Sequence, residues 1–234
     1  MENIIIASGS KEEKYRTLIP QIKALLEGEI DPVARMSNAA AAIQETFGFL
    51  WTGFYRVVKK PSSNVEASER TDVEAGEKDC GSHEESCELA VGPFQGPVAC
   101  SRIAFGKGVC GSAWKEARTL VVPDVELFPG HIRCSSAARS EIVVPMFRNI
   151  GTMENSISSD TGNSPDTGAA CTRRSDKGNT YPKHTGTGSS METKSGRSWQ
   201  DVTAVLDIDS AVSGTFDGTD AKYLEEICGI VGNC

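Results

Sequence analysis

Apolar residues recur at helical spacing in several stretches of the chain. Within residues 11–27, Leu18 and Ile22 lie four positions apart and therefore share one face of a helix. A second run begins at Asp31 and Pro32, residue types that favour the cap and the first turn of a helix. Helices are predicted over residues 11–27, 32–48, 108–116 and 217–230.

Short runs rich in β-branched and aromatic residues lie between these helices. Glycine or proline bounds the first three of these runs, as is typical of strands. The predicted strands cover residues 51–58, 87–94, 99–105, 120–122, 141–147 and 202–208. Because strands and long helices do not alternate along the chain, the pattern predicts an α+β fold, with helices packed on an antiparallel sheet.

Two stretches carry almost no large apolar side chains. They cover residues 59–86 and 149–199. Such segments cannot bury enough apolar surface to offset the loss of chain entropy, so both are predicted to be disordered insertions. The remaining residues have the length of one domain, and residues 1–234 are interpreted as a single domain with two insertions.

Charge and hydropathy exclude several classes of function. The 234-residue chain has 32 acidic residues against 24 Lys and Arg, a formal net charge of −8. This balance argues against binding to nucleic acid or to an anionic membrane surface, since both recruit basic residues. The longest apolar run near the start, residues 4–7, is far shorter than a signal-peptide core or a membrane span. A cytoplasmic location is expected.

Three of the eight cysteines lie beside glycine or polar turns. They are Cys100 in GPFQGPVACSRI, Cys110 in GKGVCGSAW and Cys134 in GHIRCSSAARSEIVVP. Packed, inert thiols are the alternative, because free cysteine is among the most buried residue types. Three such thiols in one region favour redox chemistry instead. Cys110 also stands at a predicted helix start, where the helix dipole would lower a thiol pKa, so it is a candidate nucleophile.

A metal site is not expected. Cys80, His83 and Cys87 have a spacing that a zinc site could use, but a structural zinc normally takes four protein ligands, and this group borders a predicted insertion. His131 precedes Cys134 by three residues, and that spacing on an extended segment does not ensure contact. His131 is therefore interpreted as a turn residue.

Asp207 and Asp209 lie two positions apart in the last predicted strand. Side chains two apart point to the same face of a sheet, so both carboxylates are expected on one face. Two close acids disfavour joint ionisation, which tends to leave one of them protonated near neutral pH. A protonated acid can donate a proton in catalysis. The alternative is a solvated strand end or a turn cap.

Six short motifs occur in an order that resembles a known family. The motifs are WTGFY, GPFQGPVAC, GKGVCG, GHIRC, SEIVVP and VLDIDS. In this order the chain resembles the GAF-fold family of free methionine-R-sulfoxide reductases over nearly all residues outside the two predicted insertions. The resemblance implies a GAF domain with a six-stranded antiparallel sheet, helices packed on it and a small closed pocket. It also implies reduction of free L-methionine-(R)-sulfoxide, with a thioredoxin-like protein as the reductant.

The resemblance implies roles for the cysteines as well. Cys134 is the expected nucleophile and Cys100 the resolving thiol, while Cys110 stays the second choice as nucleophile. In sulfoxide reduction a thiolate attacks the sulfur, an acid protonates the departing oxygen, and the cysteine is left as a sulfenic acid. The second thiol then condenses with the sulfenic acid.

Acids and two aromatic residues are expected to hold the substrate. Asp209 is the favoured proton donor. Asp207, together with Glu141, which the resemblance adds to the pocket, would bind the ammonium group. Trp51 and Tyr55 lie four apart in one predicted strand and so share a face, where they could enclose the methyl thioether end. Ordinary core packing is the alternative for these rings.

Further expectations concern the carboxylate, the partners and the class of function. Backbone N–H groups of residues 106–111 and of residues 134–138 are both candidates for binding the substrate carboxylate. No cofactor is expected. The expected partners are the substrate and the protein reductant, with a homodimer left open. Because GAF domains also serve as regulatory modules, a small-molecule-binding module or a redox sensor without turnover stays the alternative function.

Overall fold

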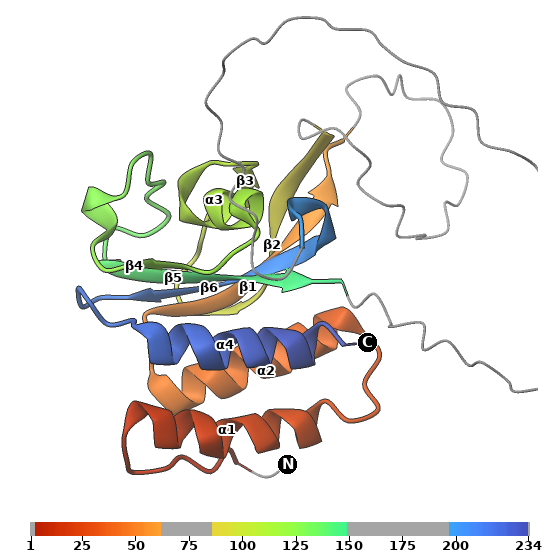
Figure 1. Ribbon diagram of the computed structural model, residues 1–234, viewed down its shortest axis with the longest axis vertical. Coiled ribbons are helices and arrows are strands. Elements are labelled where there is room, and N and C mark those ends of the chain that lie inside the picture. The colour runs from red at the N-terminus through yellow and green to blue at the C-terminus, as the bar shows by residue number, and fades with distance from the viewer. Residues whose placement is uncertain (1–2, 62–85, 149–196, 234) are drawn as a thin grey trace, which may run out of the picture. The chain divides into compact units, whose positions relative to one another are not determined.

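Within residues 3–61, 86–148 and 197–233, which the computed structural model describes, six strands form one antiparallel sheet (Figure 1). They are β1 (Trp51–Lys59), β2 (Cys87–Gln95), β3 (Arg102–Ala104), β4 (Leu120–Val122), β5 (Ser140–Phe147) and β6 (Val202–Ser210). Their order across the sheet is β3-β2-β1-β6-β5-β4, and each neighbouring pair is antiparallel. The predicted α+β fold with an antiparallel sheet is confirmed.

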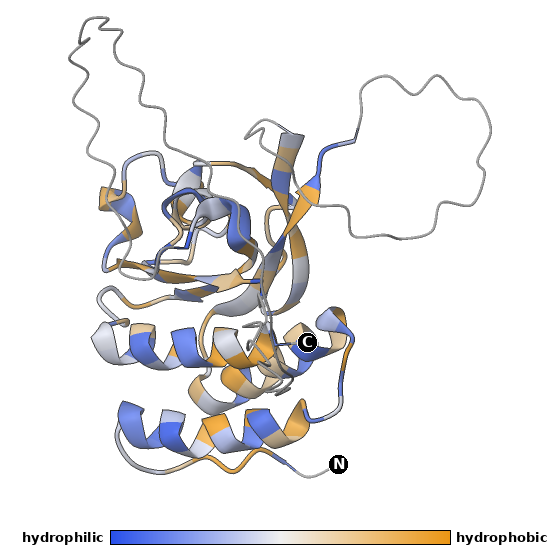
Figure 2. Cartoon of the chain, turned by 45° about the vertical axis from the view of Figure 1, so that its right-hand side comes forward, coloured by the Kyte–Doolittle hydropathy of each residue, from blue (hydrophilic) through white to orange (hydrophobic). Residues whose placement is uncertain are grey.

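Helices cover both faces of this sheet. The helices α2 (Pro32–Phe47) and α4 (Gly218–Val231) pack directly on one face, and α1 (Lys11–Leu25) packs on these two helices (Figure 1). The shorter α3 (Gly108–Glu116) lies on the opposite face. Figure 2 shows hydrophobic and hydrophilic residues alternating along α1, α2 and α4. In the described part of the chain, no helix combines the length and the apolar composition that crossing a membrane requires.

The two ends of α2 follow from the residues that cap it. Asp31 accepts hydrogen bonds from the backbone N–H groups of Val33 and Ala34, as predicted for an N-cap. Gly48 ends the helix with φ at 66°, in the left-handed region that glycine adopts without strain. Both caps pair backbone groups that a helix end would otherwise leave unsatisfied.

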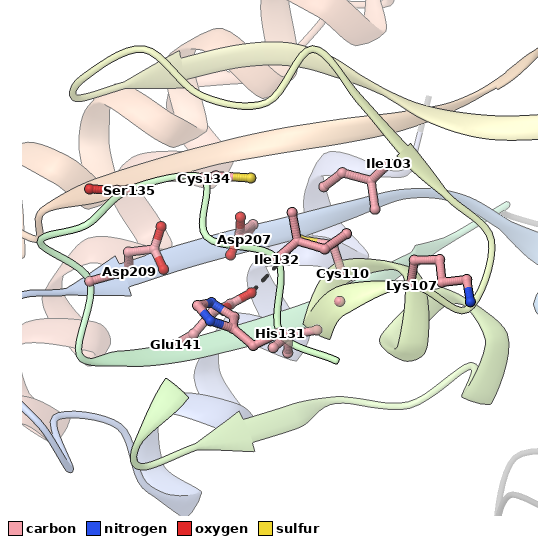
Figure 3. A pocket seen from close by; sticks show the side chains of 13 residues that line it. Ile103, Lys107, Cys110, His131, Ile132, Cys134, Ser135, Glu141, Asp207 and Asp209 are labelled. Atoms are coloured by element: carbon pink, nitrogen blue, oxygen red, sulfur yellow. Dashed lines mark hydrogen bonds and ion pairs between the residues drawn. The ribbon is translucent and has the colours of Figure 1, made fainter. Parts of the chain in front are cut away.

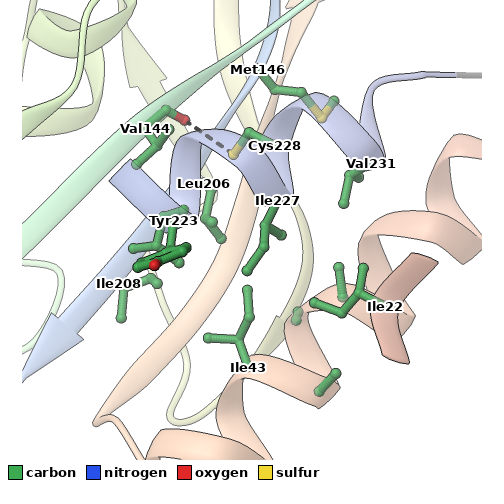
Figure 4. Packing of buried hydrophobic residues seen from close by; sticks show 14 of the residues in the cluster. Ile22, Ile43, Val144, Met146, Leu206, Ile208, Tyr223, Ile227, Cys228 and Val231 are labelled. Atoms are coloured by element: carbon green, nitrogen blue, oxygen red, sulfur yellow. Dashed lines mark hydrogen bonds between the residues drawn. The ribbon is translucent and has the colours of Figure 1, made fainter. Parts of the chain in front are cut away.

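Alternation along the strands divides the core between the two faces of the sheet. Leu206 and Ile208 are fully buried toward α2 and α4, among the side chains drawn in Figure 4. Tyr55 and Val205 point to the other face and belong to a second cluster, which includes residues of α3. Burial of one such aliphatic side chain stabilises the fold by about 1.5–3 kcal/mol. The strand residues of the second cluster are therefore the ones that face α3.

Most of both predicted insertions lies outside the described residues, which omit 62–85 and 149–196. At their edges the structure corrects the predicted boundaries. Lys59 continues β1, and Trp199 opens a 3-10 turn, η3 (Trp199–Asp201). The backbone carbonyl of Trp199 accepts a hydrogen bond from Trp114 Nε1 at 3.2 Å. Trp199 thus packs against the apolar cluster around α3. Contact with this cluster removes part of the large aromatic ring from water, which stabilises the fold.

Candidate active site

A pocket lies between α3, the sheet and the loop of residues 131–138 (Figure 3). Its acids come from β5 and β6, while its two cysteines come from α3 and from the loop. It brings together five of the predicted site residues: Cys110, Cys134, Glu141, Asp207 and Asp209. Segments that are far apart in the sequence therefore meet on the α3 face of the sheet.

Three carboxylic acids point into this pocket from two neighbouring strands (Figure 3). Asp207 and Asp209 share one face of β6, as their spacing predicts, and Glu141 on β5 pairs directly with Asp209. Directly opposed residues of paired strands place their side chains on the same face. Glu141, Asp207 and Asp209 are 6%, 6% and 8% exposed. The acids are therefore both close together and shielded from water.

Burial favours the protonated forms of the three acids. It raises the pKa of Asp209 to about 7. Burial, and then the charge of Asp209, raises the pKa of Asp207. Burial, and then the charges of Asp207 and Asp209, raises the pKa of Glu141. Asp207 and Glu141 therefore hold their protons more strongly than exposed carboxyl groups do.

The acids have little positive charge beside them. His131 Nε2 lies 3.8 Å from Glu141 Oε2, and burial, with the charge of Arg133, lowers the pKa of that imidazole. Within the described residues, no Lys or Arg forms an ion pair with Glu141, Asp207 or Asp209. A cationic group that enters the pocket would therefore meet acids that no other cation has neutralised.

One buried oxygen in the pocket has no hydrogen-bond partner among the described residues. This atom is Asp207 Oδ1. Leaving a buried polar atom unpaired costs about 1–3 kcal/mol, so such atoms are uncommon and call for an explanation. An oxygen of this kind in a pocket marks a position where a ligand can supply the missing donor or cation.

Cys110 is the third residue of α3 and is 4% exposed. Its thiol donates to Glu141 Oε1, with sulfur and oxygen 3.9 Å apart. Burial, followed by the charges of Asp207 and Glu141, raises its pKa well above the ordinary value. The prediction that the helix start lowers this pKa is wrong, because desolvation and two nearby acids outweigh the helix dipole.

A disulfide joins Cys100 to Cys134 across 34 residues of sequence, with the two Cα atoms 5.3 Å apart. Cys100 precedes β3, and Cys134 lies on the loop that lines the pocket. The two cysteines that the resemblance paired are therefore in bonding contact. Their disulfide places an oxidised sulfur pair beside the buried acids.

Trp51 and Tyr55 share one face of β1, as their spacing predicts. Their ring centroids lie 5.7 Å apart, and the Trp51 ring also stacks on Phe94 at 5.3 Å. Trp51 Nε1 donates a hydrogen bond to the carbonyl of Pro97 at 3.1 Å. Neither Trp51 nor Tyr55 lines the cavity as the described residues form it. Both rings belong to the apolar cluster on this face of the sheet, and their predicted contact with a substrate stays a prediction.

Several lining residues had no chemical signal in the sequence. Ile103 and Ile132 are apolar, and Lys107 is an exposed residue before α3. His131, interpreted as a turn residue, is brought to Glu141 by the folded loop. Its position follows from tertiary structure, so only its residue type could have marked it as a candidate.

The cavity is small while the disulfide is formed. Its volume is about 20 Å³. That space holds about one water molecule and is too small for an amino acid. A Cβ added at Gly108 would lie only 3.2 Å from the Ile132 side chain. The loop of residues 131–138 therefore packs closely on the start of α3 in the described conformation.

Comparisons with known proteins place this site in context. No family model matches the sequence. The chain is 45% identical over 232 residues to GAF domain-containing protein A of Dictyostelium discoideum, an alignment that covers 99% of both chains. It is 37% identical over 147 residues to free methionine-R-sulfoxide reductase of Saccharomyces cerevisiae, covering 61% of this chain and 68% of the yeast protein. The structure of free methionine-R-sulfoxide reductase from Neisseria meningitidis in complex with its substrate matches with a TM-score of 0.64 and 32% identity, covering 99% of this chain and 94% of that one.

Proposed function

Because the chain belongs to the GAF-fold family of free methionine-R-sulfoxide reductases, we propose that it reduces free L-methionine-(R)-sulfoxide to methionine. One observation supports this proposal most strongly. The Cys100–Cys134 disulfide lies beside a pocket of three buried acids, so a redox pair adjoins a site suited to a small cationic molecule. The solved relative from Neisseria meningitidis is described in complex with its substrate, which supports a substrate site in this fold.

The first step uses Cys134. Its thiolate attacks the sulfoxide sulfur, the sulfur–oxygen bond breaks with a proton delivered to the oxygen, and the oxygen ends on the cysteine as a sulfenic acid. Methionine leaves with its sulfur reduced by two electrons. Both Cys134 and Cys110 line the pocket, but burial and nearby acids disfavour a Cys110 thiolate, so Cys134 suits this role better.

The second step uses Cys100. Its thiol attacks the Cys134 sulfenic acid, the sulfur–oxygen bond breaks, and one water molecule leaves as the disulfide forms. The overall reaction converts one sulfoxide and two thiols into one thioether, one disulfide and water. A dithiol of the thioredoxin class then restores both thiols by exchange. The described disulfide corresponds to the oxidised product of the second step.

The acids divide between binding and proton transfer. Asp207 and Glu141 bind the substrate ammonium group, which supplies the partner that Asp207 Oδ1 lacks. The ammonium charge favours the ionised carboxylates and offsets the burial that raises the pKa of both acids. Asp209, whose pKa is raised to about 7, is half protonated near neutral pH and donates to the oxygen.

Because the cavity as described is small, we expect a rearrangement when the substrate enters. Reduction of the Cys100–Cys134 bond frees the loop that carries Cys134 and Ile132 from the segment before β3. We expect this loop to move outward in the dithiol form. The methyl thioether of the substrate could then reach Trp51 and Tyr55. Backbone N–H groups at the start of α3 or in residues 134–138 then bind the carboxylate.

A redox sensor without turnover is the second candidate function. The size of the cavity favours it, because a sensor needs only to form and break the disulfide and has no need to admit an amino acid. The name of the Dictyostelium relative specifies a GAF domain alone. Both candidates share the fold and the disulfide, so only turnover separates them.

The test is a turnover assay on the full chain with each epimer of free methionine sulfoxide and dithiothreitol as the reductant. We expect methionine to accumulate over many turnovers from the R epimer and to remain near background from the S epimer. A chain that forms its disulfide with peroxide yet yields no methionine from either epimer is a sensor or a binding module.

A further inference from the structure

Three buried side chains from three different elements converge in the pocket. The ligand-type atoms of Cys110 on α3, Glu141 on β5 and Asp207 on β6 all lie within 4.8 Å of one another. The three residues are 4%, 6% and 6% exposed. One thiol and two carboxyl groups therefore surround a common point that is shielded from solvent (Figure 3).

A second observation points to a ligand at this point. Asp207 Oδ1 is buried without a hydrogen-bond partner among the described residues, although the acid lines the pocket. Within the same residues, the one ion pair that reaches the group is that of His131 with Glu141, at 3.8 Å. The cluster is therefore rich in donor atoms for a cation and poor in resident positive charge.

We propose that Cys110, Glu141 and Asp207 form a binding site for a divalent cation of the zinc type. A tetrahedral Zn²⁺ has bonds of about 2.3 Å to sulfur and about 2.0–2.2 Å to oxygen, which place neighbouring ligand atoms about 3.5 Å apart. The Cys110 sulfur and Glu141 Oε1 are already 3.9 Å apart. Side-chain adjustments of about 1 Å would close the remaining distances.

The donor set determines which cation it takes. A thiolate with two carboxylates suits Zn²⁺ and Co²⁺, whereas Mg²⁺ and Ca²⁺ require six or more oxygen ligands. Three protein ligands leave the fourth position open toward the pocket, where a water molecule can bind. His131 contacts the second oxygen of Glu141 and is placed to orient that carboxylate.

Occupation by a metal has a consequence that rests on the proposed function. The cation would take the position assigned to the substrate ammonium group at Asp207 and Glu141. Zn²⁺ should therefore inhibit methionine formation competitively with methionine sulfoxide. Metal binding itself is independent of that assignment, because it can be measured without any substrate.

The experiment titrates Co²⁺ into the metal-free full chain with the Cys100–Cys134 disulfide intact. A thiolate ligand to Co²⁺ produces a charge-transfer absorption in the near ultraviolet. We expect this band to saturate at one Co²⁺ per chain and to be reversed by Zn²⁺ but not by Mg²⁺. Asp207→Asn should weaken Co²⁺ binding by more than about tenfold. Mutation of a residue that only supports a metal ligand already lowers metal affinity by about tenfold or more, and Asp207 is proposed as a ligand itself.

Two cysteine variants identify the thiolate. Cys110→Ser should lose the band, and Cys228→Ser, which alters the other buried free thiol of the described residues, should keep it. Circular dichroism and thermal unfolding of both variants establish that they are folded. A band that survives in Cys110→Ser places the metal on another cysteine and overturns the proposal. Absence of any band at millimolar Co²⁺ in the unchanged chain overturns it as well, whatever the result of the turnover assay.

Discussion

Glu141 and Asp209 lie directly opposite each other across the β5–β6 pairing, and both side chains point into the pocket. The pairing brings a residue from the middle of the chain to one near its end. Together with Asp207, two positions before Asp209, it creates a group of three acids on one face of the sheet. The fold therefore gathers three carboxyl groups where a small ammonium compound can bind.

The two aspartates should respond differently to amidation. Asp209→Asn keeps the shape of the side chain but removes its transferable proton, so kcat should fall about a hundredfold or more while KM changes little. Asp207→Asn removes a charge partner of the ammonium group and should chiefly raise KM. Steady-state kinetics on free methionine-(R)-sulfoxide measures both constants. Equal damage to both constants in both variants would contradict this division of roles.

Asp209 should also make stability depend on pH. Its pKa in the folded protein, about 7, lies above the ordinary value of 3.8, so its contribution is present at low pH and is lost as the pH rises through about 7. The free energy of unfolding of the oxidised chain should therefore fall relative to that of Asp209→Asn between pH 5 and 8, by about 3 kcal/mol.

Asp217→Asn is the matched control for this pH dependence. Hydrogen bonds from Lys11 and from the Thr219 backbone lower the pKa of Asp217 to about 2, so this acid is ionised throughout the range. Urea unfolding of the three proteins at each pH gives the comparison. A difference between the unchanged chain and Asp209→Asn that stays constant from pH 5 to 8 would show that Asp209 is not buried as described.

Free methionine-(R)-sulfoxide should be reduced far faster than the same sulfoxide inside a peptide. A peptide amide cannot supply the ammonium charge, so Asp207 Oδ1 would remain buried without a partner. The expected difference in kcat/KM is at least about a hundredfold. N-acetylmethionine sulfoxide is a suitable probe, because it lacks only the free ammonium group. Equal rates on the acetylated compound would exclude ammonium recognition.

The two predicted insertions should be dispensable for the fold. Replacing residues 62–85 and 152–196 with short Gly/Ser connectors shortens two loops and should raise the free energy of unfolding by roughly 1–2 kcal/mol per loop through lower closure entropy. Arg197 is retained, because its guanidinium lies 4.7 Å from the centre of the Phe147 ring. Urea unfolding and turnover are measured on each deletion. Loss of the cooperative transition would mean that an insertion is part of the folded structure.

Much of the fold could be predicted from local patterns. Helical spacing gave the position of α1, the Asp31 cap gave that of α2, and strand periodicity placed Asp207 and Asp209 on one face. These features depend on residues close in sequence. The pairing of Glu141 with Asp209 depends on which strands are neighbours, and no local pattern specifies that.

The features that were predicted wrongly or missed depend on tertiary structure. The pKa of Cys110 was predicted from its helix start alone, yet burial, followed by the charges of the acids on β5 and β6, raises it instead. Trp199 was assigned to an insertion because its neighbours in sequence are polar, and its partners lie in α3 and near β3. The position of His131 likewise follows from the folded loop.

A single-turnover experiment tests the central claim, that Cys134 and Cys100 are a catalytic pair serving this pocket. The fully reduced chain is mixed with excess free methionine-(R)-sulfoxide without any reductant, and methionine and the new disulfide are quantified. We expect one methionine per chain together with a Cys100–Cys134 disulfide identified by peptide mass mapping. Cys134→Ser should release none, Cys100→Ser should release one and stall as a sulfenic acid, and Cys228→Ser, the buried-thiol control, should match the unchanged chain. A full methionine burst from Cys134→Ser would contradict the account.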